Sequence, residues 1–501
     1  MLTGPGMQEQ DPLLLGIDIG TSGGRALLFE PTGRPVAQAS RAWSPHLPRP
    51  EWAELDAEAV WKALGLLLQE LAGRVPLHRV AGVGISAQLT TLFLDAMGSP
   101  VLPAIPWLDR RAAAEAAEIQ GAAGQGRLAE VAGRRAAPER PAAIVRWMQR
   151  HEPAAWERTA AISTVKDFLV LRLTGTLATD EPNASYSLLF DVGEKRWDPD
   201  LCRLADVDPP RLPHVIPSPA VVGKIREPVA RETGLPAGTP VVAGGPDGTL
   251  ATLGAGLTTP GMAADVAGTT DVVFACLARP RMDPSGGLVT NAHACPGQWV
   301  LGGPTTTTGG ALTWFAEHIA GTTDYPALDR EAAEIAPGSD GLLCLPALVG
   351  ERTPLWDPQA RGAFVGLTLG HRRGHLVRAL LEGGACVVRR VLLAIVSLGE
   401  RVEEVRLVGG AAGSDLTAQI RADVLGLPIR RMPVREASAL GAAILAAVGA
   451  GLFPNVPRAA RAMTGAGEFI YPRAEHRARY DKVFAAFDRA SAALRPAGGM
   501  A

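Results

Sequence analysis

Several features that would direct this chain to a membrane, a nucleic acid or an oxidising compartment are missing. Its formal net charge is only −2 at pH 7, so neither a nucleic-acid surface nor attachment to anionic lipid is indicated. The five cysteines are widely separated without metal-ligand spacing, and their odd number favours free thiols in a reducing cytoplasm. With 47% hydrophobic and 20% charged residues, the composition is still that of a folded globular protein.

Long apolar runs are absent as well. Residues 1–12 are polar and Gly-rich and lack the basic and apolar regions of a signal peptide, so we predict a disordered tail. The stretch 440–453 is rich in Ala and Gly, is too short to span a bilayer, and predicts a buried helix. A chain of 501 residues exceeds one ordinary hydrophobic core, which predicts two or more domains in a cytoplasmic protein.

The first distinctive motif lies at 13–29, where two apolar runs flank a turn rich in Gly, Thr and Ser. This pattern predicts a β-hairpin with Asp18 at its mouth, whose main-chain N–H groups and hydroxyls would converge on a phosphate. The anion-binding groups would come from Gly20, Thr21, Ser22 and Arg25. A carboxylate beside a phosphate predicts a hydrated Mg²⁺ between them. An ordinary hairpin with a flexible tip is the alternative, and neither the Walker A nor the dinucleotide fingerprint is present.

Polar residues follow a predicted buried strand at 80–85. Gln88, Leu89 and Thr90 would lie at the end of that strand, where α/β sheets usually bind ligands, although a simple polar turn is the alternative. Farther on, Trp107 and Asp109 offer a flat face and a charged hydrogen-bond partner, which suits a sugar or polyol. The alternative is a Trp at a domain edge beside a surface ion pair. The stretch 112–150 predicts a helical insertion.

A second key stretch lies at 241–256. An apolar strand leads through Gly-Gly-Pro into Asp247, and a helix of small residues follows. A carboxylate at a strand end, close to the start of a helix, suits a general base. A simple helix N-cap is the alternative for Asp247.

The opening design recurs at 262–274, with strand, turn and strand in the same order. Gly268, Thr269 and Thr270 form this second turn. The repeated pattern suggests a duplicated domain, with the two copies facing each other across a cleft. Near the end of the chain, the strand 405–408 runs into a Gly-Gly turn and the helix 416–425. A strand, Gly-rich turn and helix in this order let the backbone touch a nucleotide.

Taken in order, these motifs resemble the FGGY carbohydrate kinases, most closely their xylulokinase-like branch, within the actin/hexokinase fold group. The most specific pieces are 362–367 and 375–382, which match the family's C-terminal signature. The resemblance runs from 13 to about 487 and implies an α/β fold with two ribonuclease-H-like domains flanking a central cleft. The implied domains are 13–256, with the sugar site and catalytic base, and 257–501, with the nucleotide site.

The resemblance implies ATP-dependent phosphorylation of a hydroxyl on a small sugar, a ketose such as D-xylulose, or on a polyol, with ATP and Mg²⁺ as cofactors. It implies that Asp247 is the catalytic base and that Asp18 and Asp247 hold the metal. The implied substrate-binding residues are Gln88, Leu89, Thr90, Trp107, Asp109 and Asp247. The implied nucleotide-binding residues are Gly20, Thr21, Ser22, Arg25, Gly268, Thr269, Thr270, Gly309, Thr313, Gly410 and Ser414. A homodimer is left open, and no nucleic-acid or membrane partner is expected.

The chain departs from the family's pattern around the acceptor. Gln88-Leu89-Thr90 stands where xylulokinases usually carry Gln-Met-His, so an imidazole is missing at position 90. Ile144 replaces a usual Lys, and Pro246 and Gly248 differ beside Asp247. These changes leave the identity of the acceptor open. Two rival functions are an actin-like or chaperone-like nucleotide switch and a relic kinase that acts as a sugar-binding regulator.

Overall fold

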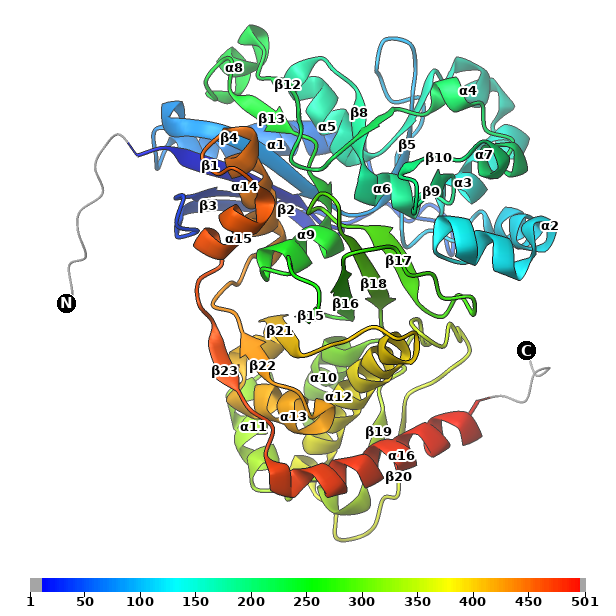
Figure 1. Ribbon diagram of the computed structural model, residues 1–501, viewed down its shortest axis with the longest axis vertical. Coiled ribbons are helices and arrows are strands. Elements are labelled where there is room, and N and C mark those ends of the chain that lie inside the picture. Colours follow the sequence, from blue (N-terminus) through cyan, green and yellow to red (C-terminus); the bar gives the residue numbers. More distant parts are fainter. Residues whose placement is uncertain (1–10, 496–501) are drawn as a thin grey trace. The chain divides into compact units, whose positions relative to one another are not determined.

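The computed structural model describes residues 11–495, which divide into two compact α/β units (Figure 1). The predicted disordered tail therefore lies outside the described residues as far as residue 10. The first unit contains the chain up to residue 258 together with 290–299 and 436–465. The second unit contains 259–289, 300–435 and the chain from 466 onward.

The first unit is built on a mixed sheet with the strand order β12-β13-β4-β1-β2-β3. Strand β1 pairs antiparallel with β2 and parallel with β4, so the predicted hairpin at 13–29 is confirmed. The strands are β1 (Leu13–Ile19), β2 (Gly23–Phe29), β3 (Pro35–Ala42), β4 (Val80–Ala87), β12 (Val221–Lys224) and β13 (Pro240–Val242), with β14 (Gly245–Pro246) also paired to β4.

Helices cover both faces of this sheet. On one face, α1 (Ala57–Ala72) and α5 (Val165–Thr174) bury the core side chains of β1 and β4. On the other face, α14 (Ala437–Gly449) lies directly on the strands and packs against α9 (Asp247–Gly254). A Cβ atom at Gly16 would lie 2.1 Å from the Ala439 carbonyl oxygen, so only glycine permits this contact.

Helices also form the outer part of the first unit, which confirms the insertion predicted over 112–150. They are α2 (Ala113–Ala132), α3 (Pro141–His151) and α4 (Pro153–Arg158). The other elements of this unit are β5 (Thr90–Leu94), β6 (Ile105–Pro106), β7 (Ala161–Ser163), β8 (Ala178–Asp180), α6 (Glu181–Tyr186), β9 (Phe190–Asp191), β10 (Arg196–Trp197), α7 (Pro199–Leu204), β11 (His214–Ile216), α8 (Glu227–Thr233) and α15 (Val456–Met463), with most of β17 (Val289–Ala292).

The second unit repeats the architecture around the strand order β18-β16-β15-β21-β22-β23. The predicted hairpin at 262–274 is the antiparallel pair β15–β16. The strands are β15 (Met262–Ala267), β16 (Asp271–Leu277), β18 (Trp299–Pro304), β21 (Glu404–Gly409), β22 (Ile429–Arg431) and β23 (Glu468–Ile470), with β19 (Leu343–Leu345) and β20 (Ala363–Val365) forming a separate pair. The helices are α10 (Thr308–Phe315), α11 (Tyr325–Ala333), α12 (Arg373–Ser397), α13 (Asp415–Leu425) and α16 (Arg477–Ala493).

The division of the chain differs from the single cut after residue 256 that we predicted. Residues 436–465 come late in the sequence but cluster with the first unit, because α14 covers the face of β1 and β4. The helix predicted over 440–453 is this α14, which ends earlier, at Gly449. A local sequence pattern cannot reveal that a late helix completes an early sheet.

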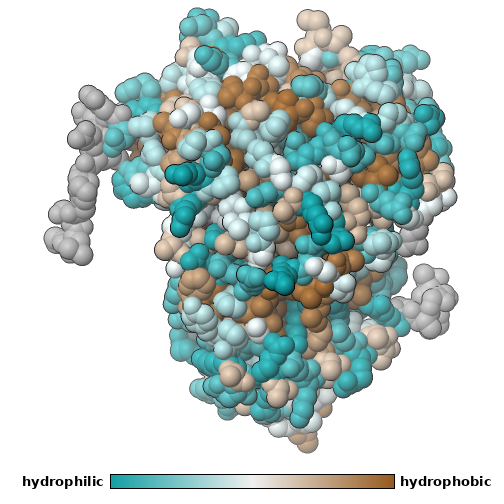
Figure 2. Space-filling view, viewed as in Figure 1, coloured by the Kyte–Doolittle hydropathy of each residue, from teal (hydrophilic) through white to brown (hydrophobic). Residues whose placement is uncertain are grey.

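No helix within residues 11–495 is both long and apolar enough to cross a membrane. On the face drawn in Figure 2, hydrophilic and hydrophobic residues are interspersed. All five cysteines are buried free thiols, as the sequence predicted for their oxidation state.

Candidate active site

Asp18 lies near the end of β1, and its ion pair with Arg25 is long. Its Oδ1 accepts a hydrogen bond from the Ser86 hydroxyl at 2.9 Å. The nearest guanidinium nitrogen, Nη1 of Arg25, is 3.9 Å from Oδ2 and only 3.1 Å from a carboxylate oxygen of Glu436. Burial, followed by the negative charge of Asp247, raises the pKa of Asp18 to about 7. A cation bound nearby would therefore stabilise the charged form of Asp18.

Asp247 is the first residue of α9 and not its N-cap, which is Pro246. Its Oδ1 accepts a hydrogen bond from the main-chain N–H of Gly248 at 2.7 Å, and burial raises the pKa of its carboxyl group. The turn before it passes close to β4, since a Cβ at Gly244 would lie 2.1 Å from the Ile85 carbonyl oxygen. This close passage brings the second carboxylate near the first.

Three predicted residues meet in one hydrogen-bonded group. The Thr21 hydroxyl donates to Gln88 Oε1 at 2.8 Å and accepts from Trp107 Nε1 at 3.1 Å. Gln88 Nε2 donates to the Gly20 carbonyl oxygen at 3.3 Å, which fixes the orientation of the amide. A threonine hydroxyl has one proton, and here Gln88 accepts it. The turn of the first hairpin is thereby tied to the side chains predicted to hold the acceptor.

The remaining predicted acceptor residues bind the chain itself. The Thr90 hydroxyl accepts a hydrogen bond from the Val165 N–H at 2.9 Å, and the Leu89 carbonyl accepts from the Trp107 N–H at 3.0 Å. Asp109 is 1% exposed and accepts from the Ala53 N–H at 2.6 Å and from Arg111. Contacts of Thr90 and Asp109 with a substrate stay predictions.

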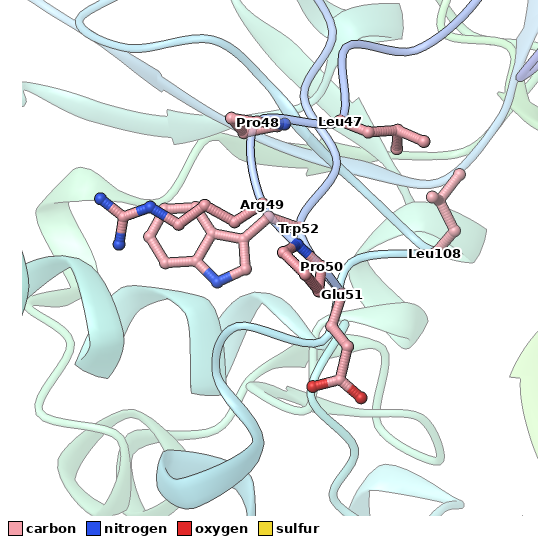
Figure 3. A pocket seen from close by; sticks show the side chains of 7 residues that line it. All are labelled: Leu47, Pro48, Arg49, Pro50, Glu51, Trp52 and Leu108. Carbon is pink, nitrogen blue, oxygen red and sulfur yellow. The ribbon is translucent and has the colours of Figure 1, made fainter.

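A cavity of about 460 Å³ opens beside the loop that contacts Asp109 (Figure 3). The guanidinium carbons of Arg49 and Arg111 lie 4.7 and 4.0 Å from a ring centroid of Trp52, so cation–π contacts already occupy this indole. The lining residues are Leu47, Pro48, Arg49, Pro50, Glu51, Trp52 and Leu108. None of them is a predicted substrate residue, so this cavity is not the candidate acceptor site.

In the second unit, the predicted phosphate turn contacts the start of α10. The Thr269 carbonyl accepts a hydrogen bond from the Gly310 N–H at 2.9 Å, and the Gly268 N–H donates to the Thr270 carbonyl at 3.3 Å. A Cβ at Gly309 would lie 2.2 Å from the Gly268 carbonyl oxygen. The backbones meet so closely that position 309 accepts only glycine. Thr313, one turn later, donates its hydroxyl proton to the Gly309 carbonyl at 3.3 Å.

The Gly-Gly turn after β21 leads into α13, which the Ser414 hydroxyl caps by accepting from the Thr417 N–H at 3.0 Å. Gly409 has a φ of +89°, and a Cβ there would lie 2.3 Å from the Ala267 carbonyl oxygen. A Cβ at Gly410 would make only ordinary contact, so Gly409 is the glycine that the turn requires. A cavity of about 960 Å³ lies between α11 and α13 and is lined in part by Asp329, Ser414 and Gln419.

A buried cation balances the carboxylates of this second hairpin. Arg421 Nη2 lies 2.5 Å from Asp271 Oδ2, and Nη1 lies 3.5 Å from Asp265 Oδ2. The Thr308 hydroxyl donates to the other oxygen of Asp271 at 2.5 Å. Sequence reasoning missed Arg421, because one cation within an apolar helix pattern has no distinctive local signal.

Comparison with known proteins identifies the family. Residues 13–254 match the N-terminal domain, and residues 263–450 the C-terminal domain, of the FGGY family of carbohydrate kinases. The chain belongs to that family. This FGGY kinase is 31% identical to the xylulose kinase of Lactococcus lactis, covering 94% of this chain and 95% of the relative. It is 35% identical to the glycerol kinase of Citrifermentans bemidjiense, with 89% and 92% covered.

A solved structure supports the same family and fold. The xylulose kinase from Rhodospirillum rubrum superposes on this FGGY kinase with a TM-score of 0.90 at 32% identity, covering 97% of this chain and 99% of that chain. The predicted family and the two-domain α/β fold are confirmed, and a sugar kinase is favoured over the nucleotide switch and the relic regulator. The assignment of roles to single residues stays a prediction.

Proposed function

We propose that the chain transfers the terminal phosphoryl group of ATP to a hydroxyl of a small ketose, such as D-xylulose, or of a polyol. The observation that carries this proposal is the pair Asp18 and Asp247, two neighbouring carboxyl groups at strand ends with raised pKa values. Burial raises the pKa of Asp265 as well, although Arg421 lies beside it, so the raised values support the proposal only together with the closeness of Asp18 and Asp247. Perturbed carboxyl groups of this kind mark functional sites.

Asp247 is proposed as the general base. Its raised pKa improves its capacity to accept a proton from the attacking hydroxyl, and its position at the start of α9 fixes the carboxylate on a rigid element. General-base assistance of this type contributes about 10² to 10⁴ in rate. Gln88 and Trp107 would orient the acceptor, with Leu89, Thr90 and Asp109 as the wall behind them.

The donor set fits a hydrated Mg²⁺ better than a protein-caged metal. Within residues 11–495, no group of three or more His, Cys, Asp or Glu side chains could hold a metal ion. Mg²⁺ characteristically keeps several waters and takes one or two carboxylates plus phosphate oxygens, and Asp18 and Asp247 supply such a pair. When bound, the ion would neutralise phosphate charge during transfer.

The nucleotide groups are proposed from both hairpins and the later turns. The Gly20 N–H already donates to the Gly23 carbonyl oxygen at 2.8 Å, and Gln88 accepts the Thr21 hydroxyl proton. Ser22 and the main-chain N–H of Thr21 would therefore face phosphate oxygens, and Gly20 would let the phosphate approach the turn closely. Arg25 would add positive charge. The remaining proposed nucleotide contacts are Gly268, Thr269, Thr270, Gly309, Thr313, Gly410 and Ser414. Close backbone passage at Gly309 and the cavity beside Ser414 support this set.

The acceptor is proposed only as a class. Similar proteins include kinases named for xylulose, glycerol and gluconate, so the family resemblance does not select one acceptor. The Thr90 hydroxyl accepts the Val165 N–H, and its own proton remains for a substrate oxygen. A cytoplasmic location and a homodimer stay predictions.

The test is ADP release from ATP and Mg²⁺ across a panel of pentuloses, hexuloses, aldonates and polyols, with Asp247→Asn as the matched control. We expect acceptor-dependent ADP release by the wild type, a phosphorylated product detected by mass spectrometry, and its loss in the variant. ATP hydrolysis that no acceptor stimulates would contradict the proposal and favour a nucleotide switch.

A further inference from the structure

A lysine that no proposed step uses lies fully buried in the first unit. Lys166, near the start of α5, is 1% exposed. Its Nζ lies 2.5 Å from the Ala243 carbonyl oxygen, 2.6 Å from Asp167 Oδ1 and 2.8 Å from Asp180 Oδ2. An ammonium group has three protons, and three oxygen atoms surround it here. The ammonium group thus hydrogen-bonds a main-chain carbonyl and forms ion pairs with two carboxylates of the chain itself.

Stability alone is a weak reason for this arrangement. Buried ion pairs repay their desolvation poorly, and well-packed apolar residues of similar size are often as stable or more so. A buried ammonium group between two carboxylates is easier to explain if it holds neighbouring groups in a fixed position. One of its three contacts is a main-chain carbonyl, so Lys166 fixes the backbone as well as neighbouring side chains.

That carbonyl immediately precedes the turn that delivers the proposed base. Ala243 follows β13 and is four residues before Asp247. Gly244 then takes a φ of +76°, and Gly245 pairs with Ser86 on β4. Ser86 in turn donates its hydroxyl proton to Asp18. The path of 243–247 thus sets Asp247 against the same strand position that holds Asp18.

The carboxylate of Asp180 supports the turn from a second side. It accepts from the Asn183 N–H at 2.9 Å and from Asn183 Nδ2 at 2.6 Å, which anchors it at the start of α6. A Cβ at Gly245 would lie 3.7 Å from Asp180 Oδ1, so the carboxylate is adjacent to the turn. Lys166 therefore joins α5, α6 and the end of β13 at one point.

We propose that Lys166 is a positioning residue for Asp247: its hydrogen bond to the Ala243 carbonyl holds the turn that aims the base. This inference rests on the proposed function. Arginine cannot replace Lys166, because a planar guanidinium is larger and does not offer three converging protons. Loss of the ammonium group should misplace Asp247 and leave the binding of ATP without Mg²⁺ unchanged, since the proposed contacts of the ATP phosphates with the chain lie elsewhere.

The first experiment compares Lys166→Met with Lys195→Met. Lys195 is a matched control, because it pairs with Glu181, next to Asp180, at 2.7 Å, and its ammonium group lies over the ring of Trp299. We expect kcat to fall by about 10-fold or more in Lys166→Met, with the Kd of ATP measured in EDTA unchanged, since small misplacements of a catalytic group cost this much. Lys195→Met should keep kcat. Wild-type kcat in Lys166→Met overturns the inference but leaves the kinase proposal intact.

A double-mutant cycle separates positioning from general damage. If Lys166 acts through Asp247, Lys166→Met should have no further effect on the residual rate of Asp247→Asn. Independent, multiplicative losses overturn the inference.

Lys166→Met leaves two buried carboxylates without a cation, and this alone destabilises the fold. The triple variant Lys166→Met, Asp167→Asn, Asp180→Asn removes this charge; it should unfold at the wild-type urea concentration yet keep the low kcat. Recovery of kcat together with stability overturns the inference.

Hydrogen exchange tests the same point without any turnover. The main-chain amides of 244–248 should exchange faster in the triple variant than in Lys195→Met, while those of α1 stay unchanged. Unchanged exchange at 244–248 overturns the inference, and this result stands even if no acceptor in the panel is phosphorylated.

Discussion

The hairpins β1–β2 and β15–β16 share a strand, a Gly-Thr turn and a second strand, but their carboxylates are balanced differently. In the second unit, Arg421 is buried against Asp271 and Asp265. In the first unit, Asp18 has only the distant and half-exposed Arg25, and Asp247 has a single main-chain N–H. The comparison teaches that the carboxylates of the second hairpin are paired with a buried cation of the chain itself, whereas Asp18 and Asp247 have none so close, as the proposed metal and base roles of the first site require.

The largest expected effect comes from removing the proposed base. Asp247→Asn keeps the size of the side chain but cannot accept a proton, so kcat should fall by about 10² or more while the Kd of ATP without Mg²⁺ is retained. Steady-state kinetics and calorimetric titration with ATP measure the two quantities. A near-normal kcat would mean that Asp247 only begins α9 and that the base lies elsewhere.

Removing the buried cation of the second hairpin should lower the free energy of unfolding. Arg421→Leu leaves Asp271 and Asp265 buried without a cation, which typically costs about 3–5 kcal/mol in the free energy of unfolding. Urea unfolding measures the loss, with the exposed Arg401→Leu in the same unit as control, expected within about 0.5 kcal/mol. Equal midpoints for both variants would show that the buried arginine is dispensable.

The uncompensated charge of the first hairpin should appear as a pH dependence. Without Mg²⁺, Asp18 stays protonated in the folded chain up to about pH 7, whereas an unfolded aspartate ionises near pH 4. The folded state therefore binds more protons in between, and the free energy of unfolding falls as the pH rises through that window.

The measurement compares wild type with Asp18→Asn in EDTA at pH 5 and pH 8. Two pH units at about 1.4 kcal/mol each give the wild type an extra loss of about 2–3 kcal/mol on moving to pH 8. The difference should shrink when Mg²⁺ is added. Parallel behaviour of the two proteins would mean that Asp18 is already compensated.

The smallest expected effect distinguishes the two glycines after β21. Gly409→Ala must adopt a φ of +89° and approach the Ala267 carbonyl, so it should cost about 1–3 kcal/mol of stability. Gly410→Ala should cost well under 1 kcal/mol, and Gly410→Val should weaken ATP binding by placing a branched side chain at the nucleotide turn. Thermal unfolding and ATP titration measure both. Similar losses of stability at 409 and 410 would contradict the assignment of strain.

Sequence reasoning succeeded where the signal is local. Alternating apolar residues around a Gly-rich turn predicted both hairpins, and a strand running into Gly-Gly-Pro predicted where Asp247 lies. It failed where partners are far apart along the chain. Arg421 and Asp271 are 150 positions apart, and Ser86 and Asp18 are 68 apart, so no local sequence pattern predicts either pair. Only the observed φ shows that Gly409 is the strained glycine of its turn, and the nucleotide contact of Gly410 stays a prediction.

The return of residues 436–465 to the first unit has a consequence for synthesis. The sheet face that α14 covers is complete by about residue 246, but α14 ends at Gly449, some 200 residues later. At a typical elongation rate of about 5–20 residues per second, that face waits roughly 10–40 s on the ribosome without its cover. The first unit is therefore finished after most of the second has been made. A fragment ending near residue 256 would expose the bare glycine-lined face as a surface for aggregation or chaperone capture.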